Sequence, residues 1–408
     1  MGLERCRGCG AGEIGVVLDF GATPIADRLA TAEDPGADDP RAPLSLGACR
    51  GCGLVQLTEA LDPALLFDDR YPYLSSVSAT LNTEAEALAG RLVRELALGP
   101  DSRVLEIASN DGYLLRHFRE AGIPVLGIDP AGPAVEAARE RGIPTVQGFF
   151  DRAQAARLAS EGERADLVIA NNVLAHTPDI DGFLEGVATV MKPSGRAVFE
   201  VQWLYRLVAA NAFDTIYHQH VFYFSLAALL PLLAAHGLTV IEAEPIAAQG
   251  GSLRVHAARG GEAGASVAEI LELEAGAGLG AEPELDGFAG RVETTASQIR
   301  DLVREFTDAG HRVAGYGAAA KATTLLHACS LGAGEVSFIV DRNPVKQGKF
   351  MPGSRIPITA PERLRADPPA AVLLLAWNLA DEILAQEKAY IEAGGRFILP
   401  LPQPRILP

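Results

Sequence analysis

The central part of the chain alternates between helical and strand-like patterns of apolar residues. Apolar side chains recur at helical spacing from Leu81 to Ala97, and the Gly-Pro-Asp stretch at 99–101 ends that predicted helix. Short apolar blocks follow, and a helical or turn-like segment separates each block from the next. They predict strands at 103–108, 125–129, 145–148, 166–170 and 196–201. This alternation favours an α/β fold with a doubly wound parallel sheet.

A second alternating series occupies the C-terminal part. The polar, glycine-rich tract 259–265 ends the first series, and a Glu- and Ala-rich helical region, about 266–309, leads to the second. Further strands are predicted at 312–317, 336–341, 371–376 and 396–400. We therefore expect a second, smaller Rossmann-like domain. The predicted domains span 1–68, 69–260 and 261–408.

Length and charge limit the possible partners. A chain of 408 residues is too long for one ordinary domain of about 100–200 residues. Its net charge of −17 repels phosphate backbones and anionic lipids, and no basic patch offsets that charge. The sequence has neither a membrane-spanning apolar run nor the apolar core of a signal peptide. We expect a cytoplasmic monomer that acts on a small molecule and binds neither nucleic acid nor membrane.

Four of the five cysteines lie in two copies of the motif Cys-Arg-Gly-Cys-Gly, at 6–10 and 49–53. Each copy places two thiolates on a tight turn, and the glycine that follows permits a left-handed backbone. The segment between the copies is poor in core residues, so a bound metal would supply missing stability. Four thiolates fill a zinc tetrahedron, which favours a structural zinc over a catalytic one or over unbound cysteines. The predicted ligands are Cys6, Cys9, Cys49 and Cys52.

The first predicted strand of the central part ends in a turn of small residues that opens a helix. Such a turn lets backbone amides approach a ligand at the carboxyl edge of the sheet, although Ala108 and Asn110 stand where glycines are more common. The next strands also end in ligand-type residues. Asp129 could accept hydrogen bonds from both ribose hydroxyls, and a ring at 149–150 could flank an adenine. The predicted cofactor-binding residues are Glu106, Ala108, Asn110, Gly112, Tyr113, Asp129, Pro130, Phe149, Phe150, Asn171 and Asn172.

Charge separates the two cofactors that such an edge can hold. Glu106 and Asp111 border the turn, and carboxylates at that place disfavour the pyrophosphate of NAD. The methionine part of S-adenosylmethionine carries an ammonium and a sulfonium, which carboxylates attract. The sequence therefore predicts S-adenosylmethionine, with NAD as the competing cofactor.

Two polar clusters are candidates for the chemistry. The segment 213–224 holds two histidines, two tyrosines and an acid, and such a group suits proton transfer because His titrates near neutral pH. The alternative is a surface loop whose polar side chains are simply satisfied. The segment 71–76 is a second cluster of aromatic and hydroxyl side chains.

These motifs together resemble a known family, the zinc-containing sugar C-methyltransferases that act on TDP-linked 4-keto-deoxysugars in antibiotic biosynthesis. The likeness extends over nearly the whole chain, from the paired cysteine motifs to the C-terminal Gly-Tyr-Gly-Ala-Ala-Ala-Lys. The blocks that carry it lie at 6–9, 49–52, 106–113, 213–218, 315–321, 340–348 and 375–378.

The resemblance implies a structural zinc, a class I methyltransferase domain and a sugar nucleotide between that domain and the C-terminal one. In the family a histidine removes the proton beside the keto group, and this base falls on His220. The other implied catalytic residues are Tyr217, His176, Tyr71 and Gln219. The predicted substrate-binding residues are Tyr73, Ser75, Ser76, Arg254, Tyr316 and Lys321.

This chain departs from the family pattern at three polar positions. Gln219 replaces a glutamate, Gln249 replaces a histidine, and Val-Ser-Ala at 77–79 replaces Tyr-Ser-Asp. A neutral amide at 219 cannot act as a base, although it can still hold His220 by hydrogen bonding. Transfer of the methyl group to oxygen or nitrogen is therefore the alternative to C-methylation. An NAD-dependent sugar oxidoreductase and a zinc-ribbon adaptor are the competitors from other classes.

Overall fold

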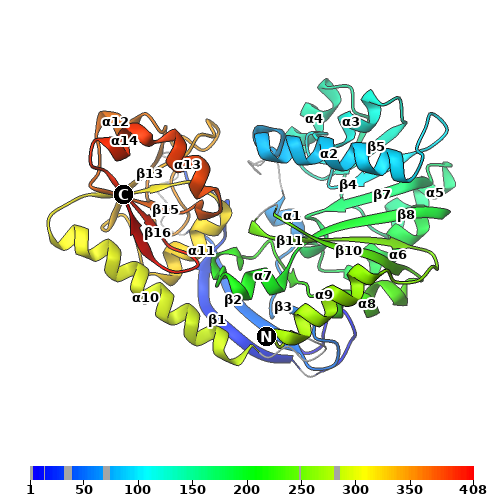
Figure 1. Ribbon diagram of the computed structural model, residues 1–408, viewed down its shortest axis with the longest axis horizontal. Coiled ribbons are helices and arrows are strands. Elements are labelled where there is room, and N and C mark those ends of the chain that lie inside the picture. The colour runs from blue at the N-terminus through cyan, green and yellow to red at the C-terminus, as the bar shows by residue number, and fades with distance from the viewer. Residues whose placement is uncertain (1–2, 13, 32–38, 68–73, 248–249, 280–284) are drawn as a thin grey trace.

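The computed structural model describes residues 3–12, 14–31, 39–67, 74–247, 250–279 and 285–408. Its strands form three sheets, of four, seven and six strands. Figure 1 shows the two larger sheets on either side of the N-terminal strands, with the C-terminal lobe to the left and the central lobe to the right. The N-terminal segment therefore contacts both lobes.

The four-stranded sheet has the order β1-β2-β3-β9 and is antiparallel throughout. Its long β1–β2 hairpin lies in the segment between the two cysteine motifs. The fourth strand comes from the polar segment 213–224 in the central part of the chain, so two regions distant in sequence share this sheet. The strands are β1 (Ile14–Pro24), β2 (Arg41–Cys49), β3 (Val55–Leu57) and β9 (Phe222–Tyr223).

The seven-stranded sheet has the order β10-β11-β8-β7-β4-β5-β6. Strands β6, β5, β4, β7 and β8 are parallel, and β11 lies antiparallel between β8 and β10. All of β4 is buried, because helices cover both faces of the sheet. The strands are β4 (Val104–Ile107), β5 (Val125–Asp129), β6 (Thr145–Gln147), β7 (Ala165–Asn171), β8 (Met191–Gln202), β10 (Thr239–Ile246) and β11 (Ser252–Ala258).

Helices alternate with these strands as the sequence pattern predicts. The helix expected at 81–97 is α2, which Ser78 caps by accepting a hydrogen bond from the backbone of Leu81. The helices of this part are α2 (Ala79–Glu95), α3 (Leu115–Glu120), α4 (Gly132–Glu140), α5 (Arg152–Ser160), α6 (Ile180–Val190), α7 (Leu204–Ala209) and α8 (Leu226–Ala235). Short helical segments are α1 (Pro63–Leu66), η1 (Ser75–Val77), η2 (Leu174–His176) and η3 (Phe213–Thr215).

The six-stranded sheet has the order β14-β13-β12-β15-β16-β17, parallel except for β17. This is the second Rossmann-like sheet that the sequence predicts. Its strands are β12 (Val313–Tyr316), β13 (Val336–Val340), β14 (Ile358–Thr359), β15 (Ala371–Leu374), β16 (Arg396–Leu399) and β17 (Arg405–Leu407). Its helical segments are α11 (Ala320–Ala328), α12 (Arg363–Ala366), η5 (Trp377–Leu379), α13 (Ala380–Gln386) and α14 (Lys388–Glu392).

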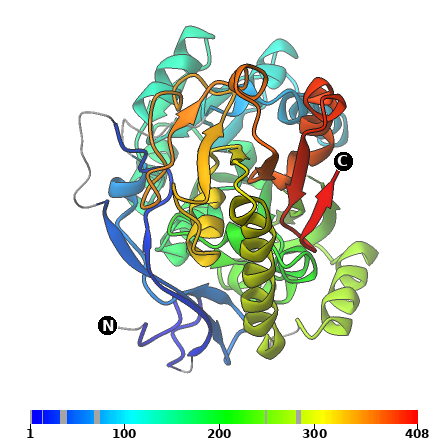
Figure 2. The ribbon, with the colours of Figure 1, turned by 90° about the vertical axis from the view of Figure 1, so that its left-hand side faces the viewer.

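Two helices, rather than one continuous helical region, connect the lobes: α9 (Ala265–Gly276) and α10 (Asp286–Asp308). Phe288, Val292, Ile299 and Val303 recur on one face of α10 and are buried. This face packs in one cluster with Leu18 and other residues of the N-terminal sheet and with the C-terminal lobe. Figure 2 shows α10 running beside the N-terminal strands.

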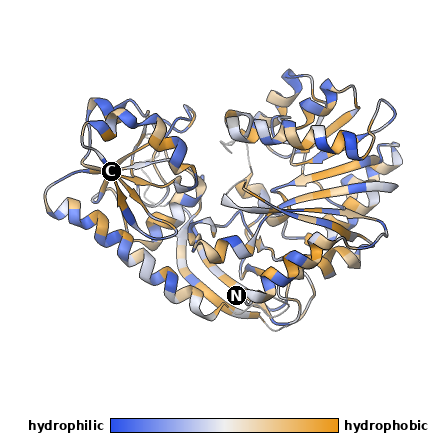
Figure 3. Cartoon of the chain, in the orientation of Figure 1, coloured by the Kyte–Doolittle hydropathy of each residue, from blue (hydrophilic) through white to orange (hydrophobic). Residues whose placement is uncertain are grey.

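The hydropathy colours of Figure 3 follow this layout, with apolar strands inside both lobes and polar residues on the outer faces of the helices. Among the described residues, no helix combines the length and the apolar character that crossing a membrane requires.

Candidate functional site

The four cysteines of the repeated motif lie together. Their sulfur atoms are all within 4.8 Å of one another, with 3.7 Å between Cys6 and Cys52 and 3.6 Å between Cys9 and Cys49. A tetrahedral zinc with bonds of about 2.3 Å would hold its sulfurs about 3.8 Å apart. The donor set and its spacing therefore fit a zinc ion that is closed to further ligands.

The two turns are local copies of each other, as the repeat predicts. Gly8 N donates to the Cys6 sulfur and Gly51 N to the Cys49 sulfur, at 3.4 and 3.3 Å. Gly10 and Gly53 have φ of 74° and 73°, the left-handed backbone that glycine permits. The contact between the two thiols lowers the pKa of Cys6 and raises that of Cys52, so Cys6 is held as the thiolate of this pair.

The turn after β4 explains why non-glycine residues occur there. Ala108, Asn110 and Gly112 have φ of 57°, 50° and 75°, so the backbone is left-handed at alternate positions. The Asn110 side-chain oxygen accepts a hydrogen bond from Ser75 N at 2.8 Å, and this bond offsets the cost of a left-handed backbone at a residue with a Cβ. Ser76 N donates to Asp111, at 3.4 Å. The predicted substrate residues Ser75 and Ser76 therefore hold the segment η1 against this turn.

Buried acceptors without a donor lie at the same turn. Glu106 Oε2, Ser109 Oγ and Asp111 Oδ1 are buried and have no hydrogen-bond partner among the described residues. Burial raises the pKa of Glu106 well above its ordinary value, and the nearby charges of Asp129 and Asp111 raise it further. These oxygens fit a ligand that brings donors and positive charge, as the methionine part of S-adenosylmethionine does.

Asp129 ends β5 beside this turn. Its two carboxylate oxygens accept hydrogen bonds from Asn110 N at 2.8 Å and Ala131 N at 2.9 Å. Each oxygen retains a further lone pair for a ribose hydroxyl. Pro130 follows Asp129 directly, and Tyr113 is half-buried against the helices of this lobe.

The two rings after β6 lie in different environments. Phe149 is 44% exposed, whereas Phe150 is buried and packs edge-on against Phe183 at 5.5 Å. Phe150 belongs to the core, so of the two rings Phe149 is the one that stays a candidate to flank an adenine.

The end of β7 is held by the neighbouring strand. Asn172 has a φ of 51°, and its amide donates to Glu200 Oε1 at 2.8 Å. The adjacent Asn171 has a buried side-chain oxygen without a partner among the described residues. Both amides therefore lie at the same carboxyl edge as the turn after β4.

His220, Tyr217 and His176 form one cluster. The His220 Nδ1–H donates to Thr215 O at 3.0 Å, which leaves Nε2 as the acceptor of the Tyr217 hydroxyl at 2.9 Å. The His176 ring lies 4.9 Å from the His220 ring, and its Nδ1–H donates to Gln219 O. Burial, and secondly the neighbouring His176, lower the pKa of His220 to about 3. His220 is therefore neutral at physiological pH, with an unprotonated Nε2.

Gln219 does not contact the His220 ring through its side chain. It is 3% exposed, and its amide donates to Ala26 O in the N-terminal domain at 2.9 Å. His218 is buried as well and donates to Ala42 O at 3.2 Å. The catalytic role expected for Gln219 stays a prediction, and in this structure its side chain holds the loop that carries His220.

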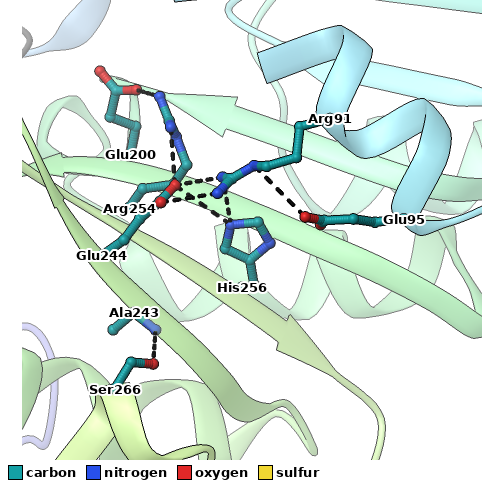
Figure 4. Close-up of polar contacts among 8 residues, drawn as sticks. All are labelled: Arg91, Glu95, Glu200, Ala243, Glu244, Arg254, His256 and Ser266. Carbon is teal, nitrogen blue, oxygen red and sulfur yellow. Dashed lines mark hydrogen bonds and ion pairs between the residues drawn. The ribbon is translucent and has the colours of Figure 1, made fainter. Parts of the chain in front are cut away.

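Arg254 lies inside a buried network of charges, not in an open binding site (Figure 4). Its guanidinium pairs with Glu200 at 3.1 Å and Glu244 at 3.0 Å across neighbouring strands. Glu244 also binds Arg91 of α2, and hydrogen bonds from His256 and then Arg91 lower its pKa. The side chain of Arg254 is committed to these carboxylates, and through Glu200 it supports Asn172.

The two predicted substrate residues of the C-terminal lobe differ. Tyr316 is 4% exposed and donates to Glu387 Oε1 at 3.2 Å, so its hydroxyl is held within the lobe. Lys321 lies over the Trp377 ring at 4.6 Å and donates to Asn378. The Trp377 indole donates to the buried Asp214 at 2.7 Å, which brings Lys321 next to the segment that carries His220.

Three predicted positions lie outside what the structure describes: Tyr71, Tyr73 and Gln249. Sequence reasoning did not single out Glu200 or Gln56 as candidates, whereas Asp214 is the acid of the polar segment 213–224. A polar residue within an apolar strand was the available signal for Gln56, which lies in the fully buried β3.

Comparison with known proteins gives three family matches in chain order. Residues 6–67 match a "Putative zinc binding domain", residues 81–243 a "Methyltransferase domain", and residues 247–402 a "C-methyltransferase C-terminal domain". The C-methyltransferase NovU of Streptomyces niveus is 39% identical over 408 residues, which cover 99% of this chain and 97% of that protein.

Two other matches are partial. The ubiquinone biosynthesis O-methyltransferase of Chelativorans sp. (strain BNC1) is 33% identical over 94 residues, or 23% of this chain and 37% of that protein. The crystal structure of magnesium protoporphyrin IX methyltransferase from Synechocystis PCC 6803 with bound SAM aligns with a TM-score of 0.37 and 15% identity. That alignment covers 49% of this chain and 99% of that structure.

The parallel sheet with its one reversed strand, the edge lined by acids and the methyltransferase match define a class I methyltransferase that uses S-adenosylmethionine. With its four-cysteine domain and its similarity to NovU over nearly the full length, the chain belongs to the zinc-containing C-methyltransferase family. The family resemblance, the fold class, the methyl donor and the zinc predicted from the sequence are thereby confirmed, and the oxidoreductase and adaptor alternatives are set aside.

Proposed function

We propose that this enzyme methylates a carbon next to the keto group of a nucleotide-linked 4-keto-deoxysugar, with His220 as the general base. The observation that carries the proposal is the hydrogen-bond pattern of the His220 ring. Thr215 O fixes Nδ1 as the protonated nitrogen, so Nε2 carries the lone pair that accepts the Tyr217 hydroxyl in this structure, and the lowered pKa of His220 keeps Nε2 unprotonated.

Tyr217 has a second role in the proposal. Its hydroxyl lies 2.9 Å from His220 Nε2, so the base and a donor for a carbonyl oxygen stand side by side. A C–H beside a ketone loses its proton to an imidazole only when a donor stabilises the developing oxyanion, which is worth about 3 kcal/mol. The proton of the substrate carbon moves to Nε2 while the Tyr217 hydroxyl turns to the substrate oxygen.

The remaining parts of the site have supporting roles. The oxygens of Glu106, Asp111 and Asp129 would hold S-adenosylmethionine at the edge of the central sheet. When bound, that cofactor supplies an electrophilic methyl group to a carbon nucleophile. Lys321 would meet the phosphates of the sugar nucleotide from the C-terminal lobe, because Trp377 and Asp214 connect it to the segment that carries His220.

Transfer to oxygen or nitrogen was the alternative because of Gln219. In this structure the Gln219 amide donates to Ala26 O. C-methylation is the better supported proposal because the chain is 39% identical to the C-methyltransferase NovU over nearly its full length.

The test is methyl transfer from ¹³C-methyl-labelled S-adenosylmethionine to a TDP-4-keto-6-deoxysugar, with the label located by NMR. We expect a new carbon–carbon bond at the position beside the ketone. A label on oxygen or nitrogen, or no transfer to any ketosugar, would contradict the proposal.

A further inference from the structure

The segment that carries His220 is built onto the zinc-binding sheet. Strand β3 pairs with β9, with Val55 opposite Tyr223 and Gln56 opposite Phe222. The next residue of β3 continues the ladder, because Leu57 N donates to Val221 O at 2.8 Å. The three residues that follow His220 are thus attached one by one to β3.

Strand β3 is in turn attached to the first cysteine turn. Gln56 is fully buried, and its amide nitrogen donates to the Cys6 sulfur at 3.0 Å. Its amide oxygen accepts a hydrogen bond from Arg7 N at 3.1 Å. The Arg7 side chain also donates to Leu57 O at 2.6 Å. Both polar atoms of Gln56 are therefore used by residues of the zinc-binding turn.

Other contacts hold the same loop from the N-terminal domain. The side chains of His218 and Gln219 donate to Ala42 O and Ala26 O, as described above. The Phe67 ring lies edge-on to the His176 ring at 5.3 Å. The N-terminal domain thus determines the position of the histidine cluster from several sides, and only Gln56 among these contacts also reaches a metal ligand in the described residues.

We propose that Gln56 is a positioning residue that couples the zinc-binding site to His220. The path is short. The Gln56 amide donates to the Cys6 sulfur, and Gln56 pairs with Phe222, which lies two residues after His220. Hydrogen bonds to metal ligands orient both partners, and their loss typically costs about 10–100-fold in metal affinity or activity. The zinc domain therefore serves catalysis by fixing the base, in addition to folding its own segment. This inference rests on the proposed role of His220.

The test compares Gln56→Met with Leu18→Val. Methionine keeps the volume of Gln56 but donates no hydrogen bond to Cys6, whereas Leu18 is a buried residue of β1, two strands away from β3. Three properties are measured for each folded variant: zinc content, affinity for S-adenosylhomocysteine, and the ¹⁵N ring signals of His220 without substrate. The His220 signals are assigned by their absence in His220→Asn, and the kcat of methyl transfer is measured in parallel.

We expect Gln56→Met to retain one zinc per chain and to bind S-adenosylhomocysteine within two-fold of the wild type. Its His220 ring signals should shift, and kcat should fall by about 10-fold or more. Leu18→Val should leave the His220 ring signals and kcat unchanged, and its melting temperature should be similar to that of Gln56→Met. Unchanged His220 signals in Gln56→Met, or equal shifts in Leu18→Val, would overturn the proposal.

A measurement on the wild-type chain covers the case in which Gln56→Met does not fold. Cadmium forms longer bonds to thiolates than zinc does, so exchanging the metal should move the His220 signals if the coupling exists. Unmoved signals would refute it. If His220→Asn keeps full methyl transfer, the proposed role of His220 fails, whereas the ring signals still report whether Gln56 couples the two sites.

Discussion

The two Rossmann-like sheets of this enzyme use the same local geometry at their carboxyl edges. In the central lobe Asp129, at the end of β5, accepts hydrogen bonds from Asn110 N in the turn and from Ala131 N. In the C-terminal lobe Asp341, which follows β13, accepts them from Ala318 N at 2.7 Å and Asn343 N at 2.8 Å. Each acid therefore joins the first strand–helix turn of its lobe to the second strand.

The two edges differ in their charged side chains. Buried oxygens of Glu106 and Asp111 line the first edge, whereas the second edge carries two lysines in addition to Asp341. Lys321 lies at the start of α11, and Lys346 donates to Ala318 O. The proposed function accordingly assigns the methyl donor to the first edge and the sugar nucleotide to the second, so that the side chains rather than the fold would select each ligand.

Asp129→Ala should have the largest effect on S-adenosylhomocysteine affinity, and it should distinguish the edge of the central lobe from that of the C-terminal lobe. Removing a charged acceptor of two backbone amides and of the ribose should weaken S-adenosylhomocysteine binding by about 100-fold. Asp341→Ala is the matched change in the other lobe and should leave this affinity within two-fold. Calorimetry with S-adenosylhomocysteine measures both variants, and equal losses would show that the two edges are not distinct sites.

Lys321→Met should produce the complementary result. Loss of the ammonium should raise the KM for a TDP-ketosugar by about 10-fold, the value of a single charge-assisted hydrogen bond, and leave S-adenosylhomocysteine affinity unchanged. Steady-state kinetics with each substrate varied in turn give the two constants. A higher KM for the methyl donor, with an unchanged KM for the TDP-ketosugar, would contradict the assignment of Lys321 to the sugar nucleotide.

The histidine cluster between the edges should make activity nearly independent of pH in the neutral range. Because burial lowers the pKa of His220 to about 3, the ring stays unprotonated well below the ordinary histidine value of about 6.5. We expect kcat/KM to vary less than about two-fold between pH 8 and pH 6. The same shift means that His220 reduces stability as the pH falls from about 6.5 toward 3, since the unfolded chain binds its proton more readily. A loss of activity with an apparent pKa near 6.5 would contradict this account.

The smallest effect concerns the turn of the first edge. Ala108→Gly removes a Cβ from a left-handed position, so stability should change by no more than about 1 kcal/mol and cofactor affinity should stay the same. Gly112→Ala should instead destabilise the lobe, because its Cβ would lie 2.8 Å from Ile143 Cγ1 at a φ of 75°. Chemical denaturation of both variants gives the comparison, and a loss well above about 1 kcal/mol in Ala108→Gly would refute the role assigned to the backbone here.

Much of this fold could be predicted from local patterns, because apolar periodicity and the repeated cysteine turns are local properties. The pairing of β9 with β3 could not, since Gln56 and Phe222 meet only in three dimensions. The charge network of Arg254 could not be predicted either, because the sequence does not show the register that places Glu200 and Glu244 opposite it. Tyr316 ends β12 and Phe150 lies three residues after β6, and contacts within their own lobes occupy both side chains, which the sequence does not show.

Exchange of the substrate proton tests the central proposal most directly. The enzyme is incubated in D₂O with a TDP-4-keto-6-deoxysugar and S-adenosylhomocysteine, which cannot donate a methyl group, and deuterium beside the ketone is followed by NMR. The account predicts exchange with the wild type, and none above background with His220→Asn, whose affinity for S-adenosylhomocysteine should be normal. Exchange that persists in His220→Asn, or its absence in the wild type, would contradict the assignment of His220 as the base.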